Sequence, residues 1–130
     1  MKILQPAGWP RPKGYANGMS ARGRLIVTAG VVGWDEQQRF TNGTLAGQFE
    51  QALRNILAIL AEDKAAPEHI VRMTCYVTDM ASYRSSLADI GRAWKSVIGP
   101  HYPAMALVAV SALVEPQALV EIEAIAVVET

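Results

Sequence analysis

Glu121 and Glu123 are the side chains of this sequence whose type and spacing best suit acid–base chemistry. They alternate with apolar residues in the run Val-Glu-Ile-Glu-Ala-Ile-Ala, so both point to one face of a strand. Met105 and Leu107 share a face of the preceding strand by the same alternation. If the two faces coincide, Glu121 lies among apolar groups, and desolvation favours its protonated form over the carboxylate. We predict that Glu121 is a general acid/base.

The other reactive side chains give no sign of a metal site or a nucleophile. Cys75 is the only cysteine and alternates with apolar neighbours, so we predict an inert buried thiol. His69 and His101 have no second cysteine and no metal-type spacing near them. A G-x-x-x-x-G-K phosphate loop is absent, which argues against nucleotide hydrolysis. We expect neither a metal nor a cofactor.

Charge and composition narrow the possible partners and the number of domains. The 12 Lys and Arg residues balance 12 Asp and Glu residues, so no basic excess is available to bind nucleic acid or a membrane surface. A chain of 130 residues is long enough for one hydrophobic core, so we predict a single domain over residues 1–130. We expect it in the reducing cytoplasm, because it has one cysteine, no signal peptide and no membrane-length apolar run.

Apolar periodicity predicts the elements that must position these side chains. Apolar residues from Phe49 to Leu60 recur at the helical period, whereas those of the segment containing Cys75 recur at every second residue, as in a strand. A β-branched run follows a turn at residues 22–24, which favours a hairpin. In chain order we predict an irregular arm lying over the fold at residues 5–16, and then this hairpin at 19–30. A helix at 44–63, a strand at 70–77 and a second helix at 79–98 follow. Two strands, at 104–113 and 119–128, end the chain.

This order, β-β-α-β-α-β-β, predicts an α+β fold with one sheet and two helices on one of its faces. The segments 104–113 and 119–128 are nearly continuously apolar, which indicates strands buried on both faces. Two helices cover only one face, so we infer that other copies of the chain cover the second.

Several segments also match the pattern of a known family. They are Gly14-Tyr15, Val27 to Gly30, Gln48 with Leu53 to Ile56, His69 to Met80, Tyr102 to Ala104, and Val120 to Ala126. Together they resemble the RidA (YjgF) family of imine/enamine deaminases from about residue 13 onward. The resemblance implies a chorismate-mutase-like fold and a homotrimer, with ligand clefts between neighbouring subunits.

The resemblance also implies a reaction, the hydrolysis of reactive enamines and imines such as 2-aminoacrylate to a ketoacid and ammonia. In the family an arginine directly after a Pro-Ala pair holds the substrate carboxylate, which its planar guanidinium suits. Met105 occupies that position here, Leu107 replaces a frequent cysteine, and Leu87 falls where the second helix usually has a polar residue. We therefore expect a substrate other than the usual carboxylate-anchored class.

The retained positions define the predicted site. Glu121 matches the acid thought to handle a water or a substrate proton, and we predict it as catalytic. Tyr15, Gly30, Met105 and Leu107 are predicted to line the substrate cleft. No metal ligand is predicted.

Two functions from different classes fit these residues. One is an enamine/imine hydrolase, and the other is a non-catalytic trimer that binds a small ligand in the same cleft. Loss of the arginine favours the binder, whereas retention of Tyr15 and Glu121 favours the enzyme. The roles of Trp34, His101 and Tyr102 stay open. Some family members carry a ribonuclease label, but this chain has no basic stripe to hold RNA.

Overall fold

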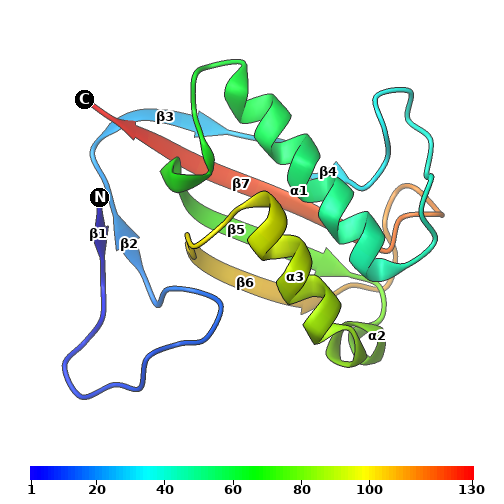
Figure 1. Ribbon diagram of the computed structural model, residues 1–130, viewed down its shortest axis with the longest axis horizontal. Helices are drawn as coiled ribbons and strands as arrows, with labels where there is room; N and C mark the ends of the chain where they lie inside the picture. The colour runs from blue at the N-terminus through cyan, green and yellow to red at the C-terminus, as the bar shows by residue number, and fades with distance from the viewer.

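A five-stranded sheet with three helices on one of its faces forms the body of the chain in the computed structural model, which describes residues 1–130 (Figure 1). The strands are β1 (Lys2–Ile3), β2 (Met19–Ser20), β3 (Gly23–Val27), β4 (Val31–Val32), β5 (Ile70–Val77), β6 (Ala104–Ala109) and β7 (Val120–Glu129). The helices are α1 (Leu45–Ala61), α2 (Met80–Ser85) and α3 (Leu87–Val97), with a 3₁₀ turn at Pro67–His69. The predicted α+β class is confirmed.

The order of strands in the main sheet is β3-β7-β5-β6, and β4 also pairs with β7. β5 and β6 are parallel, and β7 is antiparallel to β3, β4 and β5. The parallel pair needs a crossover, which α2 and α3 supply over the same face as α1 (Figure 1). β7 lies in the middle of the sheet, so its side chains are central to both faces.

α1 forms because its apolar residues make one stripe and a capping residue precedes it. The Thr44 hydroxyl accepts a hydrogen bond from the Gly47 backbone N–H at 3.1 Å, which satisfies one free donor of the first turn. Leu53, Ile56 and Leu60 are fully buried against the sheet. Burying each such side chain contributes about 1.5–3 kcal/mol, so this stripe holds α1 on the core of 19 buried residues.

The second predicted helix is two helices, which is a correction to the predicted segment 79–98. Ser86 ends α2 with φ −109° and ψ 11°, outside the helical region, and α3 starts at the next residue. Both Ser85 and Ser86 donate their hydroxyls to the Ser82 carbonyl, at 3.0 and 2.7 Å. Serine side chains compete in this way for backbone groups, which explains the break.

The predicted hairpin at residues 19–30 is wrong. β2 pairs with β1, with Met19 opposite Ile3, and not with β3. β3 begins at Gly23 itself and pairs with the far end of β7. A ten-residue central strand offers β3 a longer partner than a two-residue strand does. The chain between β1 and β2 extends to one side of the sheet (Figure 1), and contacts it through a bridge between Ala16 and Ala104.

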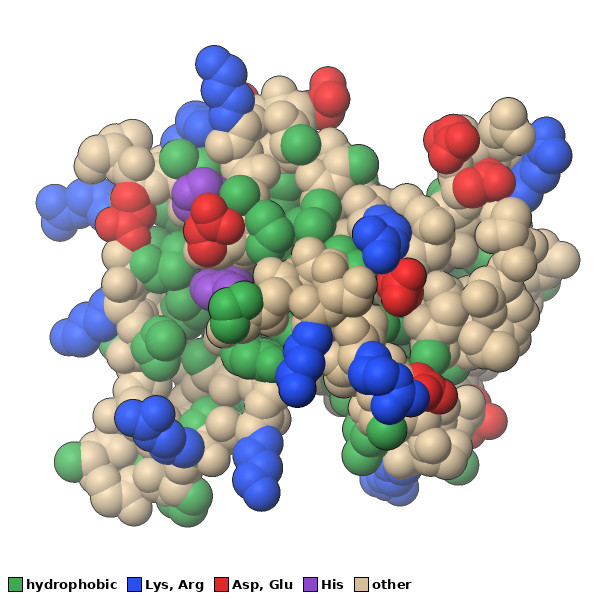
Figure 2. All heavy atoms as spheres, viewed as in Figure 1, with side chains coloured by type: hydrophobic (Ala, Val, Ile, Leu, Met, Phe, Trp, Pro, Cys, Tyr) green, Lys and Arg blue, Asp and Glu red, His purple; other side chains and the backbone are tan.

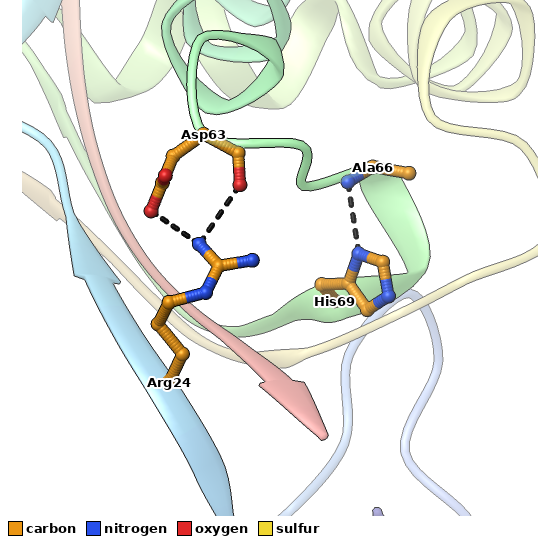
Figure 3. A network of polar contacts seen from close by, with 4 residues as sticks. All are labelled: Arg24, Asp63, Ala66 and His69. Atoms are coloured by element: carbon orange, nitrogen blue, oxygen red, sulfur yellow. Dashed lines mark hydrogen bonds and ion pairs between the residues drawn. The ribbon is translucent and has the colours of Figure 1, made fainter. Parts of the chain in front are cut away.

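A small polar network fastens the edge strand β3 to the end of α1 (Figure 3). The Arg24 guanidinium donates to the Asp63 backbone carbonyl at 2.8 Å and also pairs with the Asp63 carboxylate. Three residues later the chain turns into β5, where the Ala66 N–H donates to His69 Nδ1 at 2.9 Å (Figure 3). His69 therefore closes a turn.

The face of the sheet opposite the helices, here called the open face, is uncovered in one chain. Burial alternates along β7, with Ile122 and Ala124 buried and Glu121 and Glu123 half-buried. The predicted burial of both faces is thus not met within one protomer. Leu25, Val27 and Val108, on the edge strands, remain 65%, 63% and 43% exposed.

Candidate functional site

A cleft of about 490 Å³ opens between the N-terminal arm, α3 and β6. Figure 2 shows the molecule hollowed beside the arm. Nine of the 13 lining residues are hydrophobic. The 13 lining residues come from the arm, α1, α2, α3, the segment before β6 and β6 itself. The cleft lies on the helical face of the sheet, at the edge formed by β6.

Three of the predicted substrate-binding residues, Tyr15, Met105 and Leu107, line this cleft. Met105 and Leu107 pair in register with Met73 and Cys75 of β5, both fully buried on the helical face. Tyr15 is brought to them because the next residue bonds to the start of β6, where the Ala16 N–H donates to the Pro103 carbonyl at 2.9 Å. Their contact with a substrate stays a prediction.

Two stacked aromatic rings form part of the cleft wall. The rings of Trp94 and Tyr102 lie 5.9 Å apart between centroids and 13° from parallel. Trp94 Nε1–H donates to the His101 carbonyl at 3.0 Å, and His101 Nε2 lies 2.6 Å from the Ile70 carbonyl. That contact requires a protonated Nε2, so His101 anchors the loop before β6. Tyr102 lines the cleft, and His101 does not.

The other two predicted site residues, Gly30 and Glu121, lie together on the open face. Glu121 of β7 is opposite Val32 in β4 and Tyr76 in β5. A Cβ atom added at Gly30 would meet Glu121 Oε2 at 2.3 Å. The carboxylate of Glu121 therefore lies against the Gly30 backbone in space that only glycine leaves free.

The premise that Glu121 shares a face with Met105 and Leu107 is wrong within one chain. Ile122 and Ala124 join the buried core with Met73, and strand alternation then sends Glu121 to the opposite face. β5 also separates β7 from β6. The predicted site therefore consists of two halves on opposite faces of one sheet: the cleft with Tyr15, and the Gly30–Glu121 pair.

Glu123 has a structural partner next to the Gly30–Glu121 pair. The Tyr76 hydroxyl donates to Glu123 Oε1 at 2.6 Å. This hydrogen bond to the carboxylate is the main cause that raises the pKa of Tyr76, and desolvation of the hydroxyl is the second. Trp34 lines a second hollow that Gly30 shares with residues of α1, and the centroid of its ring lies 5.6 Å from that of Phe40.

Cys75 is fully buried in the core, which confirms that it is a buried thiol. Burial raises its pKa to about 12. The thiolate is therefore inaccessible at neutral pH, and Cys75 is no nucleophile. No three His, Cys, Asp or Glu side chains converge in the structure as metal ligands would.

The sequence reasoning missed two lysines of the cleft, Lys13 from the arm and Lys95 from α3. Leu87, noted only as a replaced polar position, also lines the cleft. The helical period places Trp94 toward the core and the next residue, Lys95, at the edge of the buried face of α3. This period could have predicted that Lys95 lies beside the cleft. Nothing local predicted Lys13, because the path of the arm depends on its contact with β6.

The family model described as Endoribonuclease L-PSP matches residues 10–128. The chain belongs to this family. A RutC family protein of Synechocystis is 32% identical over 102 residues, which cover 77% of this chain and 78% of the relative. A RutC family protein of Haemophilus influenzae is 30% identical over 91 residues, or 70% of each chain.

Solved structures of L-PSP relatives share the fold. YyfB of Yersinia pestis, from the conserved Rid protein family, superposes with a TM-score of 0.85 at 28% identity and covers 98% of both chains. RidA from an Antarctic Psychrobacter superposes with a TM-score of 0.70 at 27% identity, covering 98% of this chain and 100% of that one. These matches confirm the family resemblance and the fold. None of the helices in the structure is long and apolar enough to span a membrane.

Proposed function

We propose that this protein hydrolyses reactive enamines or imines to carbonyl compounds and ammonia, in clefts between the copies of a homotrimer. Its substrate differs from the carboxylate-anchored 2-aminoacrylate class. We also assign it to the reducing cytoplasm, in keeping with a single unpaired cysteine. Membership of a family that contains RidA supports the reaction class.

The separation of the two half-sites is the observation that carries the proposal. One chain has an apolar cleft with Tyr15 on its helical face, and a carboxylate seated on Gly30 on its open face. Neither half suffices, because the cleft has no acid in its lining and Glu121 is not among the residues that line the cleft of its own chain. A second copy whose open face approaches the β6 edge would supply the missing half.

The chemistry that such a composite site can perform is a protonation followed by hydration. The Glu121 carboxyl gives a proton to the carbon of the enamine, directly or through water, and the nitrogen lone pair forms an iminium bond. Water adds to the iminium carbon while the carboxylate accepts a proton. That proton then passes from Glu121 to the nitrogen. The C–N bond breaks and ammonia leaves, while the hydroxyl proton returns to Glu121 and a carbonyl group forms. The net reaction consumes one water.

Met105 is the reason to exclude the usual substrate. Its thioether stands where the family resemblance places a guanidinium, and a thioether cannot form two parallel hydrogen bonds to a carboxylate. Small substrates that depend on such a bidentate contact would be held weakly. The apolar lining of the cleft instead suits a larger apolar group.

The test is an imine-hydrolysis assay. Imines made in situ by an oxidase from an amino acid with a large apolar side chain are trapped with semicarbazide, and the protein is expected to reduce the trapped fraction by consuming the imine first. Glu121→Gln should lower the rate by about a hundredfold or more, the usual size of a general acid/base contribution. Met105→Arg should gain activity on 2-aminoacrylate. Full activity of Glu121→Gln would refute the role of the carboxyl.

A non-catalytic binder is the alternative outcome of the same assay. It predicts that neither the parent chain nor Met105→Arg accelerates hydrolysis of any imine, although a small ligand still binds. Loss of the arginine is the observation in its favour, and retention of the Gly30–Glu121 pair is the observation against it.

A further inference from the structure

The cleft beside the N-terminal arm is built for a larger ligand than a three-carbon acid. Its volume of about 490 Å³ falls within the range of pockets that bury ring-containing small molecules. The stacked rings of Trp94 and Tyr102 add aromatic surface to its lining, and Leu87 and Met105 add aliphatic surface. An aromatic ring suits such a lining, because aromatic groups in contact attract one another beyond the effect of burial alone.

The charged side chains that line the cleft are positive, and no negatively charged side chain lines it. Lys13 from the arm and Lys95 from α3 are its only charged lining residues. Neither lysine belongs to any of the four ion pairs of the chain. In Figure 2, basic side chains lie on both sides of the hollow beside the arm. Two unpaired ammonium groups over an apolar cavity attract an anion.

We propose that the cleft binds an aromatic anion, with the ring against Trp94 and Tyr102 and the anionic group held by Lys13 and Lys95 at the border. For the proposed function, on which this part rests, the substrate is then an enamine or imine that carries an aromatic ring and a carboxylate. The two lysines bind the substrate carboxylate, as the family's arginine does, but from positions other than that of Met105. Because they are point charges rather than a rigid fork, they hold the anion without fixing its plane.

Calorimetric titration of the whole protein tests the binding directly. Phenylpyruvate supplies the ring and the carboxylate, pyruvate supplies only the carboxylate, and phenylacetone supplies only the ring. Phenylpyruvate is expected to bind about tenfold or more tightly than either of the others. The Lys13→Gln/Lys95→Gln double variant should weaken phenylpyruvate binding about fivefold or more, in line with two solvent-exposed charge pairs. It should leave phenylacetone binding unchanged.

Lys2→Gln is a control for the loss of surface charge outside the cleft lining, because it removes one positive charge from β1. It should bind phenylpyruvate like the parent. The inference is overturned if pyruvate binds as tightly as phenylpyruvate, if the double variant binds phenylpyruvate normally, or if Lys2→Gln loses as much affinity as the double variant.

The same ligands separate failure of this inference from failure of the proposed function. Glu121→Gln should bind phenylpyruvate at least as tightly as the parent chain, because that carboxyl does not line the cleft of its own chain and an ionised carboxylate in the neighbouring cleft would repel an anion. Lysine-dependent binding without hydrolysis of any imine supports the inference and refutes the hydrolase. Hydrolysis of phenylalanine-derived imines at a rate independent of both lysines supports the hydrolase and refutes the inference.

Discussion

The contact between Gly30 and Glu121 links a backbone position to the carboxyl that we propose as the acid/base group. Gly30 has no positive φ, so its lack of a side chain matters for space rather than for backbone conformation. A Cβ there would lie 2.7 Å from the Glu121 carboxyl carbon. The carboxyl is the far end of a flexible side chain, so a methyl group at Gly30 would displace it while the fold persists.

Gly30→Ala is therefore expected to reduce imine hydrolysis by about tenfold or more and leave the unfolding midpoint nearly unchanged. Moving a proton-transfer group by about 1 Å costs a large part of its contribution. The measurement is kcat/KM in the imine assay, with thermal unfolding as the check on folding. Gly43→Ala is the matched control, because a Cβ there meets nothing within 4 Å. A Gly30→Ala protein with full activity would contradict the placement of Glu121 at the reacting centre.

At the scale of the elements, Gln48 of α1 holds the loops at one end of the sheet. It is the only buried polar residue, and its amide bonds three backbone groups. Nε2 donates to the Asn42 and Gln117 carbonyls at 3.1 and 3.0 Å, and Oε1 accepts from the Leu119 N–H at 2.8 Å. The last contact fixes the chain just before β7, and so the register that sends Glu121 to the open face.

Gln48→Leu should lower the free energy of unfolding by about 2–3 kcal/mol, because it leaves buried backbone donors and acceptors without partners. Urea denaturation at a fixed protein concentration measures the change. Gln37→Leu, at an exposed turn position, should shift the midpoint little. Equal midpoints for Gln48→Leu and the parent chain would show that water replaces the amide without cost.

At the scale of the whole molecule, the open face needs a cover that one chain does not provide. Leu25 and Val27 expose more than half of their surface there, beside half-buried Ile125. An apolar sheet face of this kind marks an interaction site. In the proposed trimer, neighbouring copies that cover this face would also bring the Gly30–Glu121 pair to a neighbouring cleft, so we expect assembly and activity to depend on the same surface.

Leu25→Glu tests this dependence. By light scattering, the parent chain should have three times its 14.1 kDa protomer mass. Burial of an unpaired charge in the interface disfavours assembly. The variant should therefore have the protomer mass and no hydrolase activity. Ile59→Glu adds the same charge at a 43% exposed residue of α1, on the helical side, and should leave the trimer intact. A parent chain that is monomeric at micromolar concentration would refute the composite site.

The sequence by itself determined the family and two central elements, β5 and α1. The alternation around Cys75 predicted β5 over residues 70–77, which are its bounds in the structure, and the stripe from Phe49 to Leu60 predicted α1 within two residues at each end. Both depend on contacts within one element, which periodicity records directly. Alternation also placed Met105 with Leu107 on one face, and Glu121 with Glu123 on one face.

Only the tertiary structure decided how those faces relate to one another. A period of two fixes which residues of one strand point together, but it does not say which face meets the helices or which strand lies next to it. Glu121 points away from Met105 because its neighbour Ile122 joins the core and β5 intervenes. Lys13 reaches the cleft of Lys95 through contacts between segments far apart in the chain. Such contacts leave no local pattern, so the two half-sites and the lysine pair could be found only in three dimensions.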